Sequence, residues 1–186
     1  MDRQTYRRTG RQAVRPADRP IDGQTDRWTD RWIDIWIDYR LTIRQRDRHV
    51  VPYKQTLPSG VYDKLLITIK GTVKPQAHMM TMDLSTPRDI AFHFNVRFNE
   101  AGKKVIVRNN ETSKKWGKEE RDGQFPFVHG KPFEMKVLCT NQAYRVAVNG
   151  SHLLEFHHRN RDLRSINNMA IHGDLTLSAV QLDRLP

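Results

Sequence analysis

The sequence from residue 50 onward predicts an all-β domain, folded as a two-sheet antiparallel β-sandwich. Short runs rich in β-branched and aromatic residues recur every 8–15 residues, separated by turn residues and without a sustained helical period. One of these runs alternates between apolar and polar residues, as a strand with one buried face does. The dipeptide Asn149-Gly150 lies between two runs and is a strong hairpin signal.

Each expected strand ends at turn-forming residues. The first ends before Gly71, and the second ends before Ser85-Thr86-Pro87. The predicted strands cover residues 64–69, 79–84, 90–98, 104–109, 133–138, 143–148, 152–156 and 175–182, with Ile171 in a further strand.

The composition of the chain changes near residue 50. Residues 1–49 contain 12 Arg and 8 Asp but no Lys or Glu, whereas every Lys and Glu comes later. Asp recurs every fourth residue from Asp22 to Asp38, as a translated tetranucleotide repeat would produce. We therefore expect a low-complexity, disordered tail over residues 1–49 and one domain over 50–186. A misplaced start codon is the open alternative for the tail.

The net charge of +11 favours acidic partners, although a basic surface also keeps a protein soluble. A basic cluster stands out near the C-terminus. It consists of His157, His158, Arg159, Arg161 and Arg164. The cluster supports an alternative function as a basic polyanion- or protein-binding module; nucleic acid is a disfavoured partner that stays open.

The single cysteine, Cys139, excludes an intramolecular disulfide and favours a reducing compartment. The N-terminus lacks the apolar stretch of a signal peptide, and no apolar run reaches the roughly 18 residues of a membrane span. We expect a cytoplasmic or nuclear protein without membrane insertion.

The run from Ile90 to Phe98 carries the most informative pattern. One face of this strand is apolar and should pack into the core. Its members are Ile90, Phe92, Phe94, Val96 and Phe98. The other face presents His93, Asn95 and Arg97 in a row, about 6.6 Å apart, and offers a ligand both hydrogen-bond donors and acceptors.

Three segments resemble, in order and spacing, the sugar-binding signature of the galectin family. They are HFNVR at 93–97, VRN at 107–109 and WGKEER at 116–121. The resemblance runs from about Val51 to Leu185 and is strongest to chimera-type galectins. It implies a jelly-roll-like sandwich of the galectin and legume-lectin type with a shallow groove on one sheet. It also implies a non-enzymatic lectin without cofactor or metal, which binds β-galactosides on glycoproteins and glycolipids and leaves the cell without a leader.

The resemblance also assigns roles to single residues. His93, Asn95 and Arg97 would bind the axial 4-hydroxyl of galactose. Asn109 would bind the 6-hydroxyl, and Trp116 would lie against the apolar face of the ring. A sugar needs such a flat platform beside convergent polar groups.

Two more residues complete the implied site. Glu119 and Arg121 would hold the 3-hydroxyl of the next sugar, and Glu119 would also orient Arg97. Charged groups strengthen hydrogen bonds to neutral hydroxyls. The implied carbohydrate-binding residues are His93, Asn95, Arg97, Asn109, Trp116, Glu119 and Arg121.

Two departures from the family pattern leave alternatives open. Val96 occupies the position of a motif proline, which leaves open a lectin fold that has lost sugar binding. Residues 1–49 differ from the Pro/Gly/Tyr-rich tail of chimera-type members, so self-association stays open as well. Catalysis is disfavoured because Glu119 and Glu120, adjacent in an expected strand, would point to opposite faces and form no glycosidase pair.

Overall fold

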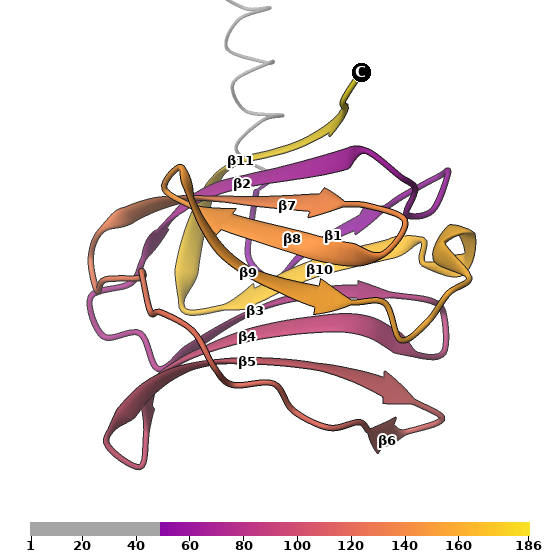
Figure 1. Ribbon diagram of the computed structural model, residues 1–186. Helices are drawn as coiled ribbons and strands as arrows, with labels where there is room; N and C mark the ends of the chain where they lie inside the picture. Colours follow the sequence, from indigo (N-terminus) through magenta and orange to yellow (C-terminus); the bar gives the residue numbers. More distant parts are fainter. Residues whose placement is uncertain (1–48) are drawn as a thin grey trace, which may run out of the picture. The chain divides into compact units, whose positions relative to one another are not determined.

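The computed structural model describes residues 49–186, which form two antiparallel sheets. The six-stranded sheet contains, from edge to edge, β1 (Tyr53–Thr56), β10 (Asn168–Gly173), β3 (Met79–Ser85), β4 (Ile90–Glu100), β5 (Lys103–Thr112) and β6 (Lys115–Trp116). The five-stranded sheet contains β11 (Leu175–Arg184), β2 (Leu65–Val73), β7 (Pro132–Cys139), β8 (Ala143–Val148) and β9 (Ser151–His157). A short 3-10 turn, η1 (Leu163–Ser165), precedes β10. Figure 1 shows β2, β7 and β8 stacked above β3, β4 and β5. The predicted all-β sandwich is confirmed.

The expected tail over 1–49 lies outside the described residues, apart from His49. In residues 49–186 no helix combines the length and apolarity that crossing a membrane requires.

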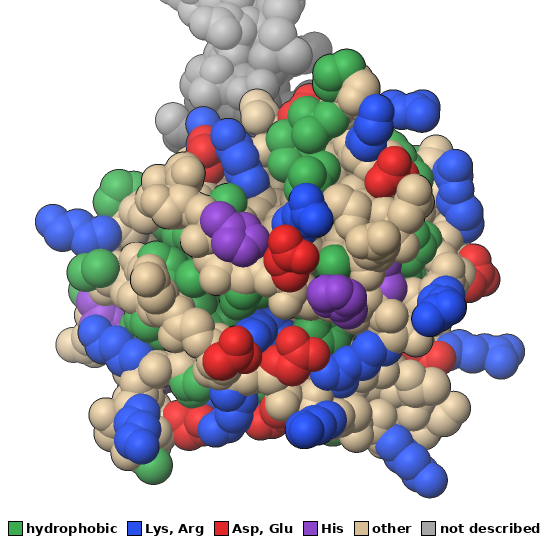
Figure 2. Space-filling view, in the orientation of Figure 1, with side chains coloured by type: hydrophobic (Ala, Val, Ile, Leu, Met, Phe, Trp, Pro, Cys, Tyr) green, Lys and Arg blue, Asp and Glu red, His purple; other side chains and the backbone are tan. Residues whose placement is uncertain are grey.

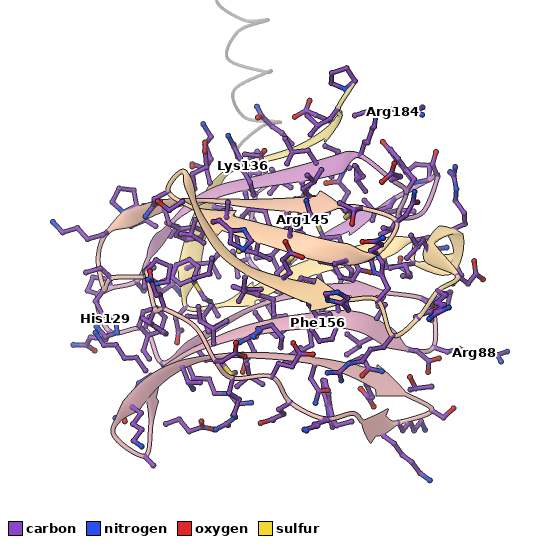
Figure 3. All side chains as sticks on the ribbon, in the orientation of Figure 1. Arg88, His129, Lys136, Arg145, Phe156 and Arg184 are labelled. Atoms are coloured by element: carbon purple, nitrogen blue, oxygen red, sulfur yellow. The ribbon has the colours of Figure 1, made fainter. Side chains whose placement is uncertain are left out.

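The core lies between the sheets and is built on the apolar face of β4. Phe92 is fully buried; its ring stacks on Tyr144 of β8, with centroids 4.6 Å apart, and lies 5.2 Å from the ring of Phe156 of β9. Figure 3 shows Phe156 in the layer between the sheets. The predicted core residues Phe92, Phe94, Val96 and Phe98 are buried, whereas Ile90 at the start of β4 is only half-buried. This packing fixes which face of β4 points outward.

The strand boundaries differ from the prediction in instructive places. Gly71 does not end a strand: it lies inside β2, where a β-carbon would come 2.4 Å from the carbonyl oxygen of Thr176 on β11. Glycine therefore permits a close approach there instead of a turn. The short strands β1 and β6 were not predicted. Asn149 and Gly150 have φ values of 52° and 82°, as the predicted hairpin turn requires.

Cys139 of β7 should be inert in the native protein. Its side chain is fully buried, and burial raises the pKa of the thiol to about 12. Because the thiolate is the reactive form, we expect no reaction with a disulfide reagent such as Ellman's at about pH 8. The same protein unfolded in guanidinium should release one equivalent. Rapid labelling of the native protein would contradict the buried position.

Candidate functional site

The outer face of β4 carries a row of polar side chains. Burial of Phe92, Phe94 and Val96 on the inner face leaves His93, Asn95 and Arg97 pointing away from the core. The neighbouring strands place Asp83 of β3 and Asn109 of β5 directly beside His93. The site therefore lies on the outer face of the six-stranded sheet, centred on β4.

His93 is oriented by a carboxylate and lies beside an exposed indole. Its Nδ1 is 2.6 Å from Oδ1 of Asp83, and the other oxygen of this carboxylate, Oδ2, lies 3.4 Å from Nε2 of His172. In the neutral tautomer whose Nδ1–H donates to Asp83, Nε2 of His93 is an acceptor. The rings of His93 and Trp116 are 4.8 Å apart at an angle of 58°, and Trp116 is 53% exposed. A core position for this tryptophan is thereby excluded.

Asn95 acts on the site from beneath. It is 2% exposed and donates from Nδ2 to Oγ1 of Thr81 at 2.8 Å. Its Oδ1 accepts a hydrogen bond of 2.6 Å from Nε of Arg97. The amide is thus largely used inside the protein, where it fixes the guanidinium group of Arg97. One lone pair of Oδ1 remains for a ligand.

Four charged side chains form a network at the end of this row. The closest carboxylate to Arg97 belongs to Glu100, whereas the oxygen of Glu119 lies 4.0 Å from it. Arg121 bonds both acids, with 2.7 Å to Glu119 and 2.7 Å to Glu100. Hydrogen bonds from Arg121 and then from Arg97 hold the pKa of Glu100 below its ordinary value. The alternating charges keep one another in place.

Asn109 is held by residues from distant parts of the chain. Arg159, which follows β9, donates from NH1 to Oδ1 of Asn109 at 3.0 Å and to Oδ1 of Asn110 at 2.8 Å. Nδ2 of Asn109 donates to the carbonyl of Gly117 at 3.0 Å, which leaves one amide hydrogen free of protein partners. A β-carbon at Gly117 would lie 2.4 Å from Oδ1 of Asn110. Glycine at this position is therefore part of the geometry that fixes Asn109.

The segment with Glu119 and Arg121 is attached to β5 through Arg108. The backbones of Arg108 and Glu120 exchange two hydrogen bonds of 2.9 Å in an isolated bridge. The buried guanidinium group of Arg108 donates to Oδ1 of Asp122 at 2.7 Å and lowers the pKa of that carboxyl. The predicted strand over Glu119 and Glu120 is therefore wrong, because only this bridge forms.

The face as a whole combines a flat apolar ring with fixed polar groups. Trp116 offers the apolar surface, His93 an acceptor, and Arg97 and Arg121 offer charged donors. A polyhydroxylated ring with hydroxyls on one side and a C–H patch on the other fits these requirements. Within residues 49–186 no group of three His, Cys, Asp or Glu side chains could hold a metal ion.

Residues 52–182 match the family described as galactoside-binding lectin. The chain belongs to this family. Over 129 residues it is 50% identical to mouse galectin-3 and 48% identical to dog galectin-3, covering 69% of this chain and 49% and 44% of those proteins. It is 36% identical to pig galectin-4 over 135 residues, covering 71% of this chain and 41% of that protein. The chain spans about half the length of the galectin-3 relatives it matches.

Two solved structures of galectins share the fold. Sheep galectin-11, solved with glycerol, has a TM-score of 0.63 and 27% identity, with 71% of this chain and 97% of that one covered. Caenorhabditis elegans galectin LEC-6 has a TM-score of 0.66 and 21% identity, covering 73% of this chain and 92% of that one. The galectin resemblance and the jelly-roll-like sandwich expected from it are confirmed.

The structure gathers all seven predicted site residues on one face. The sequence did not identify Asp83, Thr81, Glu100 or Arg159, which orient them. The alternation of polar residues along 79–84 was a usable signal for Thr81 and Asp83. No local sequence pattern predicts that Arg159 orients Asn109, because its side chain reaches Asn109 from the other sheet.

Proposed function

We propose that the chain is a non-enzymatic lectin that binds β-galactosides of the lactose and N-acetyllactosamine type on glycoproteins and glycolipids. The observation that carries this proposal is the exposed ring of Trp116, 4.8 Å from the ring of His93 at the end of the polar row on β4. The carboxylates of Glu100 and Glu119 are each paired with arginine, which suits them to hold hydroxyls rather than to exchange protons with a glycosidic bond.

Each polar group has a partner in the proposed complex. The axial 4-hydroxyl of galactose would donate to Nε2 of His93 and accept from Arg97, with the free lone pair of Asn95 beside it. The free amide hydrogen of Asn109 would bind the 6-hydroxyl. Glu119 and Arg121 would bind the 3-hydroxyl of the next sugar. An equatorial 4-hydroxyl would leave these groups unmatched, at a cost of about 1–3 kcal/mol each.

Affinity for a single disaccharide should be modest. A disaccharide of roughly 23 heavy atoms at about 0.3 kcal/mol per atom gives about 7 kcal/mol, or a Kd on the order of ten micromolar at best. Strong attachment to a glycan-coated surface would then require several sites acting together. Self-association of the chain stays a prediction.

Calorimetric titration of the chain with lactose and, separately, cellobiose tests the proposal. The two disaccharides differ at the 4-hydroxyl of the terminal sugar. We expect binding of lactose between about ten micromolar and one millimolar and none of cellobiose. No heat with either sugar from a folded protein would reject the proposal and favour a lectin fold without sugar binding.

We also propose synthesis in the cytosol and action outside the cell after export that bypasses the glycosylation machinery. Asn110 stands in a glycosylation sequon, but its side chain accepts from Arg159 and donates to Thr112. A glycan at Asn110 would break these contacts next to Asn109. Synthesis away from the glycosylation machinery avoids that damage.

Lactose affinity should fall in acid. The pKa of Glu100 is depressed, so its contribution is complete above the ordinary value of 4.5 and is lost as pH falls through the lower value of the folded protein. In titrations of the folded protein we expect affinity to hold as pH falls to 4.5 and to decline only below it, as Glu100 takes up a proton. A Glu100→Gln variant should bind less tightly at neutral pH and show a flatter profile. Identical profiles for both proteins would contradict this role.

A further inference from the structure

Residues 49–186 contain nine arginines, and they fall into two groups. Five have a carboxylate partner within 4.0 Å: Arg97, Arg108, Arg121, Arg145 and Arg159. The other four have none among the described residues. They are Arg88, Arg161, Arg164 and Arg184. Three of these four lie together at one end of the sandwich, which is unexpected for a surface where charges of both signs are mixed.

Arg164 and Arg184 share one aromatic ring. Their guanidinium carbons lie 5.7 Å and 5.8 Å from the ring centroid of Tyr62. NH1 of Arg164 also donates to the carbonyl of Ser59 at 3.0 Å. These contacts hold the two guanidinium groups at the wall of a hollow of about 350 Å³, which Asn141 and Leu163 also line.

A second hollow continues the first. It shares Asn141 and Leu163 with it and adds Arg161 and His157. Figure 2 shows Lys and Arg side chains projecting along the right-hand edge of the domain, and Figure 3 labels Arg184 there near the C-terminus. We call the two hollows together the basic groove. It contains none of the seven residues of the galactoside site.

The basic groove differs from the cluster predicted from the sequence. Arg159 is turned away toward Asn109 and Glu120. His158 still lines the second hollow, but its Nε2 lies 2.8 Å from the carbonyl oxygen of Thr140. Burial lowers the pKa of His158, which disfavours its charged form. Arg184, which is distant in sequence, takes the place of Arg159. One carboxylate, Asp63, lines the groove, and its Oδ1 accepts from the backbone N–H of Asn141 at 3.1 Å.

We propose that the basic groove is a second binding site that takes a sulfated polysaccharide. Guanidinium forks bind sulfate oxygens in pairs, and two adjoining hollows with successive cations suit a chain with repeated anionic groups. Single-stranded nucleic acid fits less well, since it needs aromatic faces on which bases stack. The only Phe, Tyr or Trp ring of the groove is that of Tyr62, which both arginines contact.

The test is titration of the full chain with a heparin-derived hexasaccharide at low and at physiological salt. Arg164→Gln/Arg184→Gln should lower the affinity at least tenfold and flatten its salt dependence. The matched control is Arg88→Gln/Lys131→Gln, which removes the same charge from exposed residues outside the groove and should change the affinity less than twofold. Equal losses in the two double variants, or no binding by the parent chain, would overturn the proposal.

Two further arms identify the ligand class and separate this site from the galactoside site. A single-stranded oligonucleotide should bind more weakly than the hexasaccharide; tighter binding through the same arginines would replace a sulfated sugar with nucleic acid. Excess lactose should not displace the hexasaccharide, and the groove variant should bind lactose like the parent. Displacement by lactose would reject a separate site. A chain that binds the hexasaccharide through the groove but not lactose would refute only the galactoside proposal.

Discussion

A Trp116→Ala variant should lose lactose affinity by about 30-fold, equivalent to about 2 kcal/mol, while the protein stays folded. The indole is an exposed flat aromatic ring beside the polar row, and its centroid lies 4.8 Å from that of the His93 ring. Truncation removes the platform for the C–H face of galactose and exposes the remaining hydrogen bonds to water. Because Trp116 is already 53% exposed, its loss should hardly change the free energy of unfolding. Calorimetry and thermal unfolding measure the two quantities separately.

Two variants make the result specific. Trp116→Phe keeps a flat ring and should recover a large part of the affinity. Val128→Ala shortens another exposed apolar side chain, 54% exposed, that lies outside the site and should leave lactose binding unchanged. Equal affinities of the parent and Trp116→Ala would mean that the sugar does not lie on the indole, and the proposed groove would have to be abandoned.

The sequence predicted the sandwich because the alternation of apolar and polar residues along a strand reflects which of its faces is buried. The pattern of β4 placed Phe92 inside and His93 outside, and the structure agrees. The sequence failed where a strand is defined by its neighbours instead of its own pattern. β6 has only two residues and is a strand only because it pairs with the end of β5. From its sequence context Gly71 was predicted to end a strand. The structure shows that glycine is needed there because β11 approaches its backbone closely.

The candidate site shows the same division. The residues that would contact the sugar lie in three segments that resemble the galectin signature, so the sequence alone predicts them. The residues that orient them lie outside these segments and were not predicted. Asp83 meets His93 through the register of β3 and β4, and Arg159 reaches Asn109 from beyond the five-stranded sheet. Such contacts depend on how strands pair and how the sheets pack, which no local pattern encodes.

Arg108→Met should lower the free energy of unfolding by about 2–3 kcal/mol and weaken lactose binding several-fold. The guanidinium group is 2% exposed and donates to the carbonyl of Asp122 at 2.5 Å and to its carboxylate at 2.7 Å. Methionine fills similar space but makes none of these bonds. The backbone that carries Glu119 and Arg121 would lose its anchor to β5. Since the Asp122 carboxylate is 89% exposed, no buried charge is left behind to raise the cost further.

Arg145→Met is the matched control, since Arg145 pairs with Glu155 at 3.2 Å but is 52% exposed. This substitution should lower the free energy of unfolding by less than about 1 kcal/mol and leave lactose affinity unchanged. The depressed pKa of Asp122 makes the effect of Arg108 depend on pH. The Arg108–Asp122 pair stabilises the fold above the ordinary Asp pKa of 3.8, and this stabilisation is lost as pH falls through the lower pKa of Asp122 in the folded protein. The stability gap between the parent and Arg108→Met should therefore narrow in strong acid. Equal, pH-independent losses for both variants in denaturant titrations would show that Arg108 contributes no more than a surface ion pair, and the segment with Glu119 and Arg121 would need another anchor.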